Sequence, residues 1–595
     1  MSLLDSASLI VTPNGYSENT IYSVIPSSGV GDLTFTRATD AWRTNSQGLV
    51  QRVAWNLVQY SEQFNNAAWS KSRTSVLSNT AISPNGDLTA TTLIEDTSNA
   101  THRVFQSLSK SSTPIQYTFS CYLKAKERTF AQIRIAENGE ADSASAVINL
   151  STGQLIGTYG TYSNVSASVV SLNNGWYRLS ITATSVNASS IVAFIFLALN
   201  GNLSSPAYLG NGTSGIYIWG AQLVEGSSAL EYFTTTDRQD VPRIDYSLGG
   251  CPNILLEPQR TNLALRSEEF DNASWIKTAS NVTANSAISP SGVQNADTLT
   301  GDGTFALHAI NQSGSATSGV TYTHSIYAKK NTNNFIQLLG TGSIYTTATI
   351  FANFDLNLGV VGSVGVGATA TIQSVGNGWY RCTMTATALA TTTGSFILPC
   401  LITSATSLRG EINSLSTSVF IWGAQLEVGA YASSYIYTTS ASVTRNADTM
   451  TRSNIFTEGL ITAAGGTWFM DIRNNRVLTR DTSTNGLFLL DSSLSSFGFR
   501  IKTYVNARLT ISKVVTGVET QLFTTTTDTC KIAIKWNGST ADVFQNGVEV
   551  VSATAFTSTN MDTIGALPLD VPKYISSMSL FPTPLSDAEC IQLTI

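Results

Sequence analysis

Apolar and polar residues alternate in short runs along most of the chain. Between residues 117 and 123, for example, Tyr, Phe, Cys and Leu alternate with Thr, Ser and Tyr. A period of two is that of a strand with one buried face. Turn residues such as Gly, Pro, Asn and Asp interrupt the runs about every ten residues, and no long stretch has a helical period. The pattern predicts an all-β chain built from β-sandwiches or jelly rolls.

One stretch of about twenty residues occurs twice. The sequence IYIWGAQLVEGSSALEYFTTT covers 216–236, and VFIWGAQLEVGAYASSYIYTT covers 419–439. In the same way, NNGWYRLSITAT at 173–184 matches GNGWYRCTMTAT at 376–387. A repeat distance of roughly 200 residues is too long for a solenoid and fits a duplicated domain. We therefore predict two copies of one domain, each of about 180 residues.

The two copies divide the rest of the chain into further parts. The segment before them is shorter than about 60 residues, so it is expected to need partners or neighbouring chains and to serve as an anchor. The segment between them is too apolar for a loose linker and is expected to pack as a fixed spacer. The predicted parts are an N-terminal segment at 1–55, a jelly roll at 56–236, a spacer at 237–261, a second jelly roll at 262–439, a connector at 440–456 and a third sandwich at 457–595.

The third sandwich carries its own local signals. Asn-Gly pairs at 537–538 and 546–547 predict two tight turns that join three strands. Ser586 followed by Glu589 has the spacing of a capping box, which predicts a short helix after the last strand.

Charge limits the classes of partner. Charged residues make up 12% of the chain, the net charge is −6 and the pI is about 5.3. This balance offers no basic surface, so nucleic acid is excluded as a partner. The most apolar run, at 191–199, is less than half as long as a membrane helix, and the first residues lack a signal-peptide pattern. We expect a soluble protein without membrane insertion.

Six cysteines and three histidines raise the question of a disulfide or metal site. No CxxC pair occurs, and the histidines lack the spacing of metal ligands. His324 aligns with Phe119 of the first copy, which indicates a packed residue. Three cysteines align with apolar residues of the other copy: Cys121 with Ile326, Cys382 with Leu179 and Cys400 with Leu197. We expect no metal centre, no cofactor and no disulfide framework.

Three resemblances rest on these motifs. The two copies, through GWYR and IWGAQL, resemble jelly-roll carbohydrate-binding modules of the family 4/9 type. The third sandwich, with KIAIKWNGSTADVFQNGVEV and the closing LSDAE helix, is similar to laminin-G/concanavalin-like domains. The whole plan, with GDLTFTRATDAWRTNSQGLV and the spacer VPRIDY…CPNILLEPQRTNL, resembles bacteriophage virion fibre proteins of the head or the tail. Such fibres are usually homotrimers mounted by their N-termini.

The resemblance implies a location on the phage particle. It also implies attachment to other virion proteins through the N-terminus, and binding of host-surface or environmental glycans. Modules of this type often hold a structural calcium through a carboxylate in the last strand. Here Glu225 aligns with Val428 and Glu427 with Val224, so a calcium site shared by both copies is not expected.

Aromatic residues are the candidates for stacking on sugars. Those of the repeated motifs lie in strands with apolar alternation, where core packing is the expected role: Trp176, Tyr177, Trp219, Trp379, Tyr380 and Trp422. Trp69 and Trp275 follow polar turns near the entry to each copy, and they are the two candidates for carbohydrate contact, with packing as the alternative. Arg178 and Arg381 of GWYR are expected to brace a strand pair.

Hydrolysis of a polysaccharide needs a facing pair of carboxylates. The densest acidic stretches are 137–142 and 268–271, and in the first copy Glu269 and Asp271 are replaced by Gln63 and Asn65. Solvated loops are the expected role of both stretches. No nucleophile elbow, Ser-His-Asp order or Walker A sequence occurs, and no catalytic residue is assigned.

We expect a non-enzymatic structural fibre protein that displays β-sandwich modules for adhesion to glycans, with the C-terminal domain contacting the ligand. Weak single sites would gain strength from multiple copies. Two alternatives remain open at this point: a tail-spike-type polysaccharide depolymerase, and a decorative or spacer virion protein without a ligand.

Overall fold

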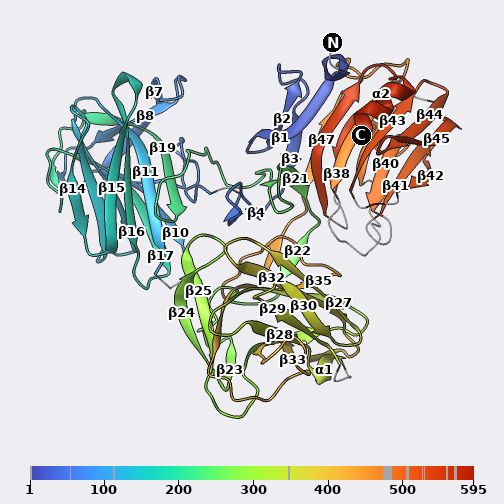
Figure 1. Ribbon diagram of the computed structural model, residues 1–595. Coiled ribbons are helices and arrows are strands. Elements are labelled where there is room, and N and C mark those ends of the chain that lie inside the picture. Colours follow the sequence, from blue (N-terminus) through green and yellow to red (C-terminus); the bar gives the residue numbers. More distant parts are fainter. Residues whose placement is uncertain are drawn as a thin grey trace. The chain divides into compact units, whose positions relative to one another are not determined.

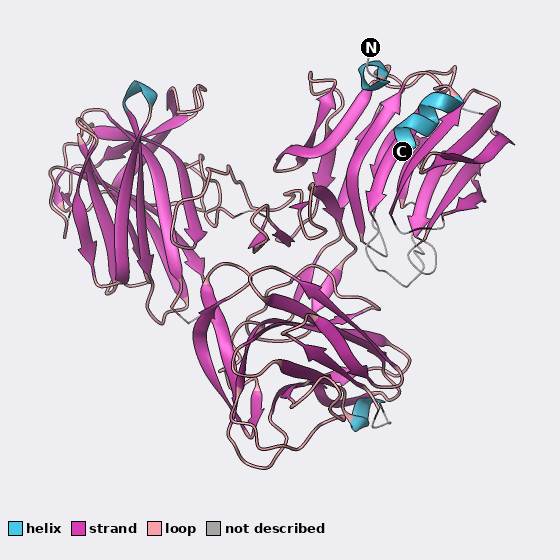
Figure 2. Cartoon of the chain, viewed as in Figure 1, coloured by secondary structure: helices cyan, strands magenta, loops and turns pink. Residues whose placement is uncertain are grey.

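The computed structural model is all-β, and the residues it describes form many strands and only short helices (Figure 1; Figure 2). The structure describes residues 3–53, 55–110, 114–204, 206–345, 349–473, 486–503, 508–525, 527, 529–557, 561–567 and 572–595. The chain divides into two compact units. Unit 1 combines 1–53, 239–291 and 295–595, and unit 2 combines 54–238 and 292–294.

Unit 2 contains the first jelly roll, a sandwich of two antiparallel sheets, and the predicted bounds of 56–236 fall inside it. One sheet has the order β14 (Gln154–Gly160), β13 (Ser143–Asn149), β12 (Phe130–Ala136), β17 (Ser190–Ala198), β10 (Arg103–Ser109) and β6 (Ser70–Ser72). The other has the order β15 (Ser163–Ser171), β16 (Trp176–Thr184), β11 (Gln116–Ala125), β19 (Gly215–Glu225), β8 (Ala90–Glu95) and β7 (Thr74–Ala81). The short elements are β9 (Asn99–Ala100), η2 (Asn173–Gly175) and β18 (Tyr208–Leu209). The apolar residues of β11 face the core between the sheets, as predicted. The prediction of a single buried face is wrong, because the polar residues on the other face of β11 are buried too.

The second jelly roll repeats this plan within unit 1. One sheet has the order β23 (Ile276–Thr278), β26 (Ala309–Ala316), β34 (Pro399–Leu401), β28 (Phe335–Leu339), β29 (Phe351–Asp355) and β30 (Val360–Val364), with β33 (Thr392–Ile397) also on β26. The other has the order β24 (Ser280–Ile288), β25 (Gln294–Gly301), β35 (Ser418–Val428), β27 (Thr321–Lys330), β32 (Trp379–Thr387) and β31 (Ala368–Ser374). A short helix, α1 (Gly342–Tyr345), lies between β28 and β29 in the chain.

A buried carboxyl distinguishes the second copy and predicts a pH dependence. Burial raises the pKa of Asp297 on β25 to about 7, although the amides of Phe270 and Asn285 donate to it. The unfolded carboxyl ionises near pH 3.9, so the folded protein loses stability as the pH rises from about 4 through 7. We expect Asp297→Asn to remove about 2–3 kcal/mol of this loss between pH 5 and pH 8. Urea unfolding of the original protein and the variant at pH 5 and pH 8 measures this change in the free energy of unfolding. The same pH dependence in both proteins would contradict the prediction.

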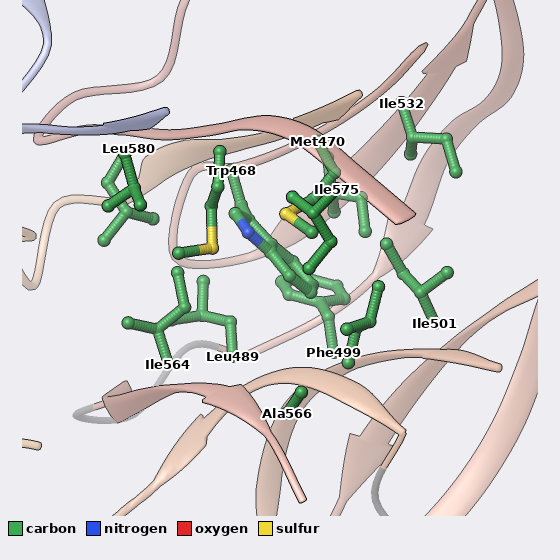
Figure 3. Packing of buried hydrophobic residues seen from close by; sticks show 14 of the residues in the cluster. Trp468, Met470, Leu489, Phe499, Ile501, Ile532, Ile564, Ala566, Ile575 and Leu580 are labelled. Carbon is green, nitrogen blue, oxygen red and sulfur yellow. The ribbon is translucent and has the colours of Figure 1, made fainter. Parts of the chain in front are cut away.

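The C-terminal sandwich is built from one long curled sheet. Its order is β42 (Val518–Thr524), β41 (Leu509–Val515), β40 (Phe497–Thr503), β39 (Leu487–Asp491), β46 (Met561–Ala566), β37 (Thr449–Ser453), β3 (Leu33–Thr36), β2 (Thr20–Ile25), β1 (Leu9–Ser17), β47 (Lys573–Phe581), β38 (Gly466–Arg473), β43 (Thr529–Trp536), β44 (Thr540–Gln545) and β45 (Val548–Ala555). Figure 3 shows its core, where Trp468 and Met470 of β38 pack with Phe499 of β40 and Ile564 of β46. The predicted concanavalin-like sandwich is confirmed at the level of fold class.

The first strands of the chain belong to this C-terminal sandwich. β1 pairs antiparallel with β47, with Leu9 opposite Leu580, and β3 pairs with β37. The side chains of Leu9, Val11 and Phe35 are buried in the same core as the C-terminal strands. This pairing corrects the prediction of a separate N-terminal segment at 1–55, because these strands complete a sheet and are not an independent piece. A short 3-10 helix, η1 (Leu3–Ser6), precedes them.

The predicted spacer and connector are also parts of ordered sheets. The spacer holds β20 (Ile244–Asp245) and β21 (Asn253–Leu256), and β21 pairs with β47. The predicted connector at 440–456 contains β37, a strand of the long sheet, which corrects its description as a connector. Two small antiparallel pairs complete the unit. β4 (Trp42–Thr44) forms a hairpin with β5 (Val50–Arg52), and β22 (Arg260–Asn262) pairs with β36 (Val443–Arg445) across the second jelly roll.

Several local predictions are confirmed. The Asn-Gly turns join β43 to β44 and β44 to β45. Ser586 and Glu589 form a capping box at the start of α2 (Asp587–Thr594). One alignment is wrong by one residue: Gln337 opposes Cys400 where Gln132 opposes Phe196, so Cys400 corresponds to Phe196 and not to Leu197. A shift of one residue moves a side chain to the other face of a strand.

Candidate functional site

Three arginines occupy matching places in the segments that flank the jelly rolls. Arg37 and Arg243 precede the matching Asn56 and Asn262 by the same number of residues. Both asparagines have the same role, because each donates to backbone oxygens of the closing strand region of its own copy. Arg445 lies in TRNAD, which repeats the TRATD around Arg37.

The three arginines meet in one buried cluster, called here the linker-arginine cluster: Arg37, Arg243, Arg445, Glu257 and Asp448. Arg37 contacts Asp448 with 2.9 Å between Nη1 and Oδ1, and Arg243 also pairs with Asp448. Glu257 pairs with Arg243 at 2.5 Å and with Arg445. The cluster therefore joins the N-terminal segment, the spacer and the strand that follows the second jelly roll.

The charges of this cluster are almost fully removed from water, since each side chain is at most 3% exposed. Burial opposes ionisation of Glu257, but Arg445 and Arg243 outweigh it and lower the pKa of this carboxyl. Burial lowers the pKa of Arg37, and the neighbouring Asp448 offsets only part of this effect. Buried ions of this kind are stable only when every partner is present.

A cavity of about 240 Å³ lies beside the cluster and shares Glu257 with it. Ser434, whose hydroxyl donates to Glu257 at 2.6 Å, also lines the cavity. We call it the hub cavity. Its floor is the outer face of β31 and β32, with hydroxyl, amide and guanidinium groups: Thr369, Thr371, Gln373, Arg381, Thr383 and Thr385. Its other walls come from the N-terminal segment, the spacer, the end of the second jelly roll and the last strand: Trp42, Arg43, Asp245, Tyr431 and Tyr574. Sequence elements from both ends of unit 1 are therefore needed to form it.

Arg381 fixes the floor of the hub cavity. Its guanidinium donates to Ser325 Oγ at 2.9 Å and to the Ser433 carbonyl at 2.6 Å, and it lies 5.3 Å from the Tyr327 ring centre. Arg178 of the first copy makes the same bond to Ser120, at 3.0 Å. The predicted role of both arginines in bracing neighbouring strands is confirmed.

Two carboxylates line the hub cavity in different environments. Asp245 accepts from the amide of Thr44 at 2.8 Å and from Ser247, while burial, the largest effect, raises its pKa. Glu257 is held ionised by the arginines of the cluster. A cavity with aromatic walls, hydroxyl groups and paired charges suits a small polar ligand such as a sugar residue.

The aromatic candidates are placed differently from the hub cavity. Trp69 and Trp275 are each 1% exposed, and each indole nitrogen donates to a backbone oxygen at 3.0 Å. This burial corrects their selection as carbohydrate contacts. The four tryptophans of the repeated motifs are buried, as expected for core packing: Trp176, Trp219, Trp379 and Trp422.

The acidic stretches are not simply solvated. Glu140 contacts Arg103 at 2.6 Å and Arg134 at 3.3 Å, and Glu269 pairs with Arg266 at 3.0 Å. This corrects the prediction of solvated loops for these two residues. Glu225 opposes Tyr117, whereas Glu427 opposes Thr323, so the two glutamates lie one position out of register, as the alignment predicted.

The three histidines and five of the six cysteines are buried, and Cys251 is the exposed one. His102 and His308 hold matching places, since the Nδ1 of each contacts a backbone oxygen, of Arg73 and Ala279 respectively. Burial lowers the pKa of His324 to about 3. Among the described residues, no group of three or more His, Cys, Asp or Glu side chains has a metal-binding arrangement. In that same part of the chain, no helix has the length and apolar character needed to cross a membrane.

Sequence reasoning missed the linker-arginine cluster. The signal was present, because TRATD at 36–40 and TRNAD at 444–448 repeat one motif, and Arg243 has the same distance to its jelly roll as Arg37. Comparison of the flanking segments with one another, rather than of the jelly rolls alone, identifies it.

No protein-family model matches the chain, and no curated protein sequence matches it. Among solved structures, the LG1-3 region of the laminin α2 chain matches over 81% of this chain and 96% of its own, at 10% sequence identity and a TM-score of 0.13. The strand orders of the two jelly rolls and the C-terminal sandwich define the protein as an all-β chain of tandem sandwiches.

Proposed function

We propose that this chain is a non-enzymatic structural and adhesion protein, a fibre of a phage particle that binds glycans of the host surface or its surroundings. The hub cavity carries the proposal. Its floor of threonines and Gln373 offers several donors and acceptors, and Tyr431 and Tyr574 supply aromatic walls. Sugars are bound by this combination, in which hydroxyls meet polar side chains and the sugar face meets a ring.

The size of the hub cavity limits the ligand. Its volume of about 240 Å³ lies below the ~300–1,000 Å³ of drug-sized sites, so it fits one sugar residue of a longer chain. A site of this size binds weakly by itself. Display of several copies on one particle, as in a homotrimer attached to other virion proteins, would raise the effective strength.

A substitution on the cavity floor tests the proposal. Gln373→Ala removes an amide that lines the hub cavity and is expected to weaken glycan binding at least tenfold, about 1.4 kcal/mol. Val170 holds the matching strand position in the first copy, opposite Arg178 as Gln373 is opposite Arg381, and Val170→Ala is the control. A glycan array with the full chain, followed by titration of the best hit, gives the readout. Equal binding by both variants would remove the hub cavity as the site.

The competing function is a polysaccharide depolymerase. One observation favours it: the hub cavity holds Asp245, with a raised pKa, and Glu257, with a lowered pKa. Glycosidases use two carboxyl groups whose pKa values differ in this way, one as an acid and one as a carboxylate. The same preparations incubated with bound polysaccharide decide between the two functions. New reducing ends would establish hydrolysis, and their absence at full occupancy supports adhesion.

A further inference from the structure

The outer face of one sheet of unit 2 carries a platform of phenylalanine rings. Phe105 of β10 and Phe194 of β17 lie 5.2 Å apart between ring centres, and Phe194 stacks on Phe196 at 5.6 Å. The three residues come from neighbouring strands, with Phe105 opposite Phe194 in the register. β10 and β17 lie side by side in the sheet (Figure 1).

Two arginines lie over this platform. Arg103 lies 4.8 Å from the ring centre of Phe194, and Arg134 of β12 lies 4.8 Å from that of Phe196. Cation–π contacts of this kind orient a guanidinium and leave its edge free to bind a carboxylate. The arginines are 20% and 12% exposed, so water and a ligand reach them from one side.

The protein's own Glu140 occupies the space between the two arginines. Its carboxylate contacts Arg103 at 2.6 Å and Arg134 at 3.3 Å, and its side chain is 26% exposed. Glu140 has φ of 58°, in the left-handed region, where a residue other than glycine costs roughly 1–2 kcal/mol. Burial lowers the pKa of Arg134, Glu140 offsets only part of this effect, and the neighbouring Arg103 lowers it further, so an anion beside the two arginines stabilises their charges.

The fold does not require these charges. In the second jelly roll the four matching register positions hold only apolar side chains, which form a closed cluster: Ala309, Leu339, Leu398 and Cys400 in place of Arg103, Arg134, Phe194 and Phe196. Packing alone is thus satisfied by alanine and leucine at the places of the two arginines. The two arginines are therefore a feature of the first copy that the fold itself does not need.

We propose that Arg103 and Arg134 form a binding site for the carboxylate of an acidic sugar, and that Glu140 occupies this site until a glycan displaces it. The Phe platform keeps the two guanidiniums in place while the anions exchange. This inference takes from the proposed function only that the partner is a glycan. It names a second site, in unit 2, and a substrate class, the uronic-acid polysaccharides.

Polygalacturonate, dextran and dextran sulfate are the probes, each titrated against the full chain at low salt. We expect polygalacturonate to bind and neutral dextran not to bind. Glu140→Gln removes the internal competitor and is expected to tighten polygalacturonate binding about tenfold. Arg103→Ala and Arg134→Leu introduce the residues of the second copy, so the fold is expected to persist, and both are expected to weaken binding at least tenfold.

The outcomes separate this site from the hub cavity. Val170→Ala lies outside both sites and is expected to leave polygalacturonate binding unchanged. Arg103→Ala and Arg134→Leu leave the hub cavity intact, so failure of one site does not imply failure of the other. Dextran sulfate that binds as tightly as polygalacturonate, and is insensitive to the arginine variants, would show nonspecific polyanion binding and overturn the proposal. Unchanged affinity in Arg103→Ala and Arg134→Leu, or no binding even by Glu140→Gln, would overturn it as well. Thermal melts of each variant confirm that the sandwich is intact.

Discussion

Replacing Asp448 with asparagine is expected to lower the free energy of unfolding of unit 1 by about 3–5 kcal/mol. Asp448 is fully buried and pairs with Arg37 and Arg243, and it also accepts from the amide of Glu257 at 2.7 Å. The substitution removes the negative charge but leaves both arginines in the interior. An uncompensated buried charge is far more costly than the loss of a surface pair.

Asp40→Asn is the matched control for this prediction. Asp40 pairs with Arg52 at 3.0 Å, but the two side chains are 33% and 24% exposed, so the expected cost is below about 1 kcal/mol. Scanning calorimetry of the full chain separates the units, because the transition of unit 2 should stay where it is. If Asp448→Asn lowers the free energy of unfolding by less than about 1 kcal/mol, the linker-arginine cluster does not stabilise unit 1.

The jelly rolls were predictable because their signals are local or repeated. Alternation in β11 identifies a strand with one apolar face without any knowledge of its neighbours, although its polar face is buried as well. The two IWGAQL copies fix the domain period. The capping box at Ser586 is likewise complete within four residues. Each of these features depends on residues that are close in sequence or on a comparison of the chain with itself.

The sheet of the C-terminal sandwich was not predictable in the same way. The pairing of β1 with β47 joins the two ends of the chain, and nothing in the local pattern of β1 names its partner. Alternation tells which face of a strand is buried but not against which sheet. For this reason the first strands were assigned to a segment of their own.

The candidate site illustrates both limits. The hub cavity needs Trp42, Asp245 and Tyr574 from three distant segments, so no window of sequence contains it. The sequence shows the acidic stretch around Glu140 but not the arginines that it contacts. Arg103 and Arg134 come together only because strands β10, β12 and β17 lie side by side. The contrast with Ala309 and Leu339 then separates what the fold needs from what the first copy adds.

Replacing Leu9 with alanine is expected to destabilise the C-terminal sandwich by about 2–5 kcal/mol, although the two lie at opposite ends of the chain. The side chain of Leu9 is fully buried in the core that contains Trp468 and Met578. Its removal leaves a cavity beside β47, where Leu9 opposes Leu580. Hydrogen exchange of the β47 and β38 amides reports the effect directly, since these strands should lose protection while those of unit 2 keep theirs.

Leu4→Ala provides the comparison, because Leu4 lies five residues earlier and is 45% exposed. The same chemical change at this surface position is expected to alter stability by no more than about 0.5 kcal/mol. An N-terminal segment that served only as an anchor would give equal, negligible effects for both leucines. A large difference between them follows instead from a sheet in which the first strand of the chain is a central member, so attachment to other proteins would have to use its exposed neighbours rather than β1 itself.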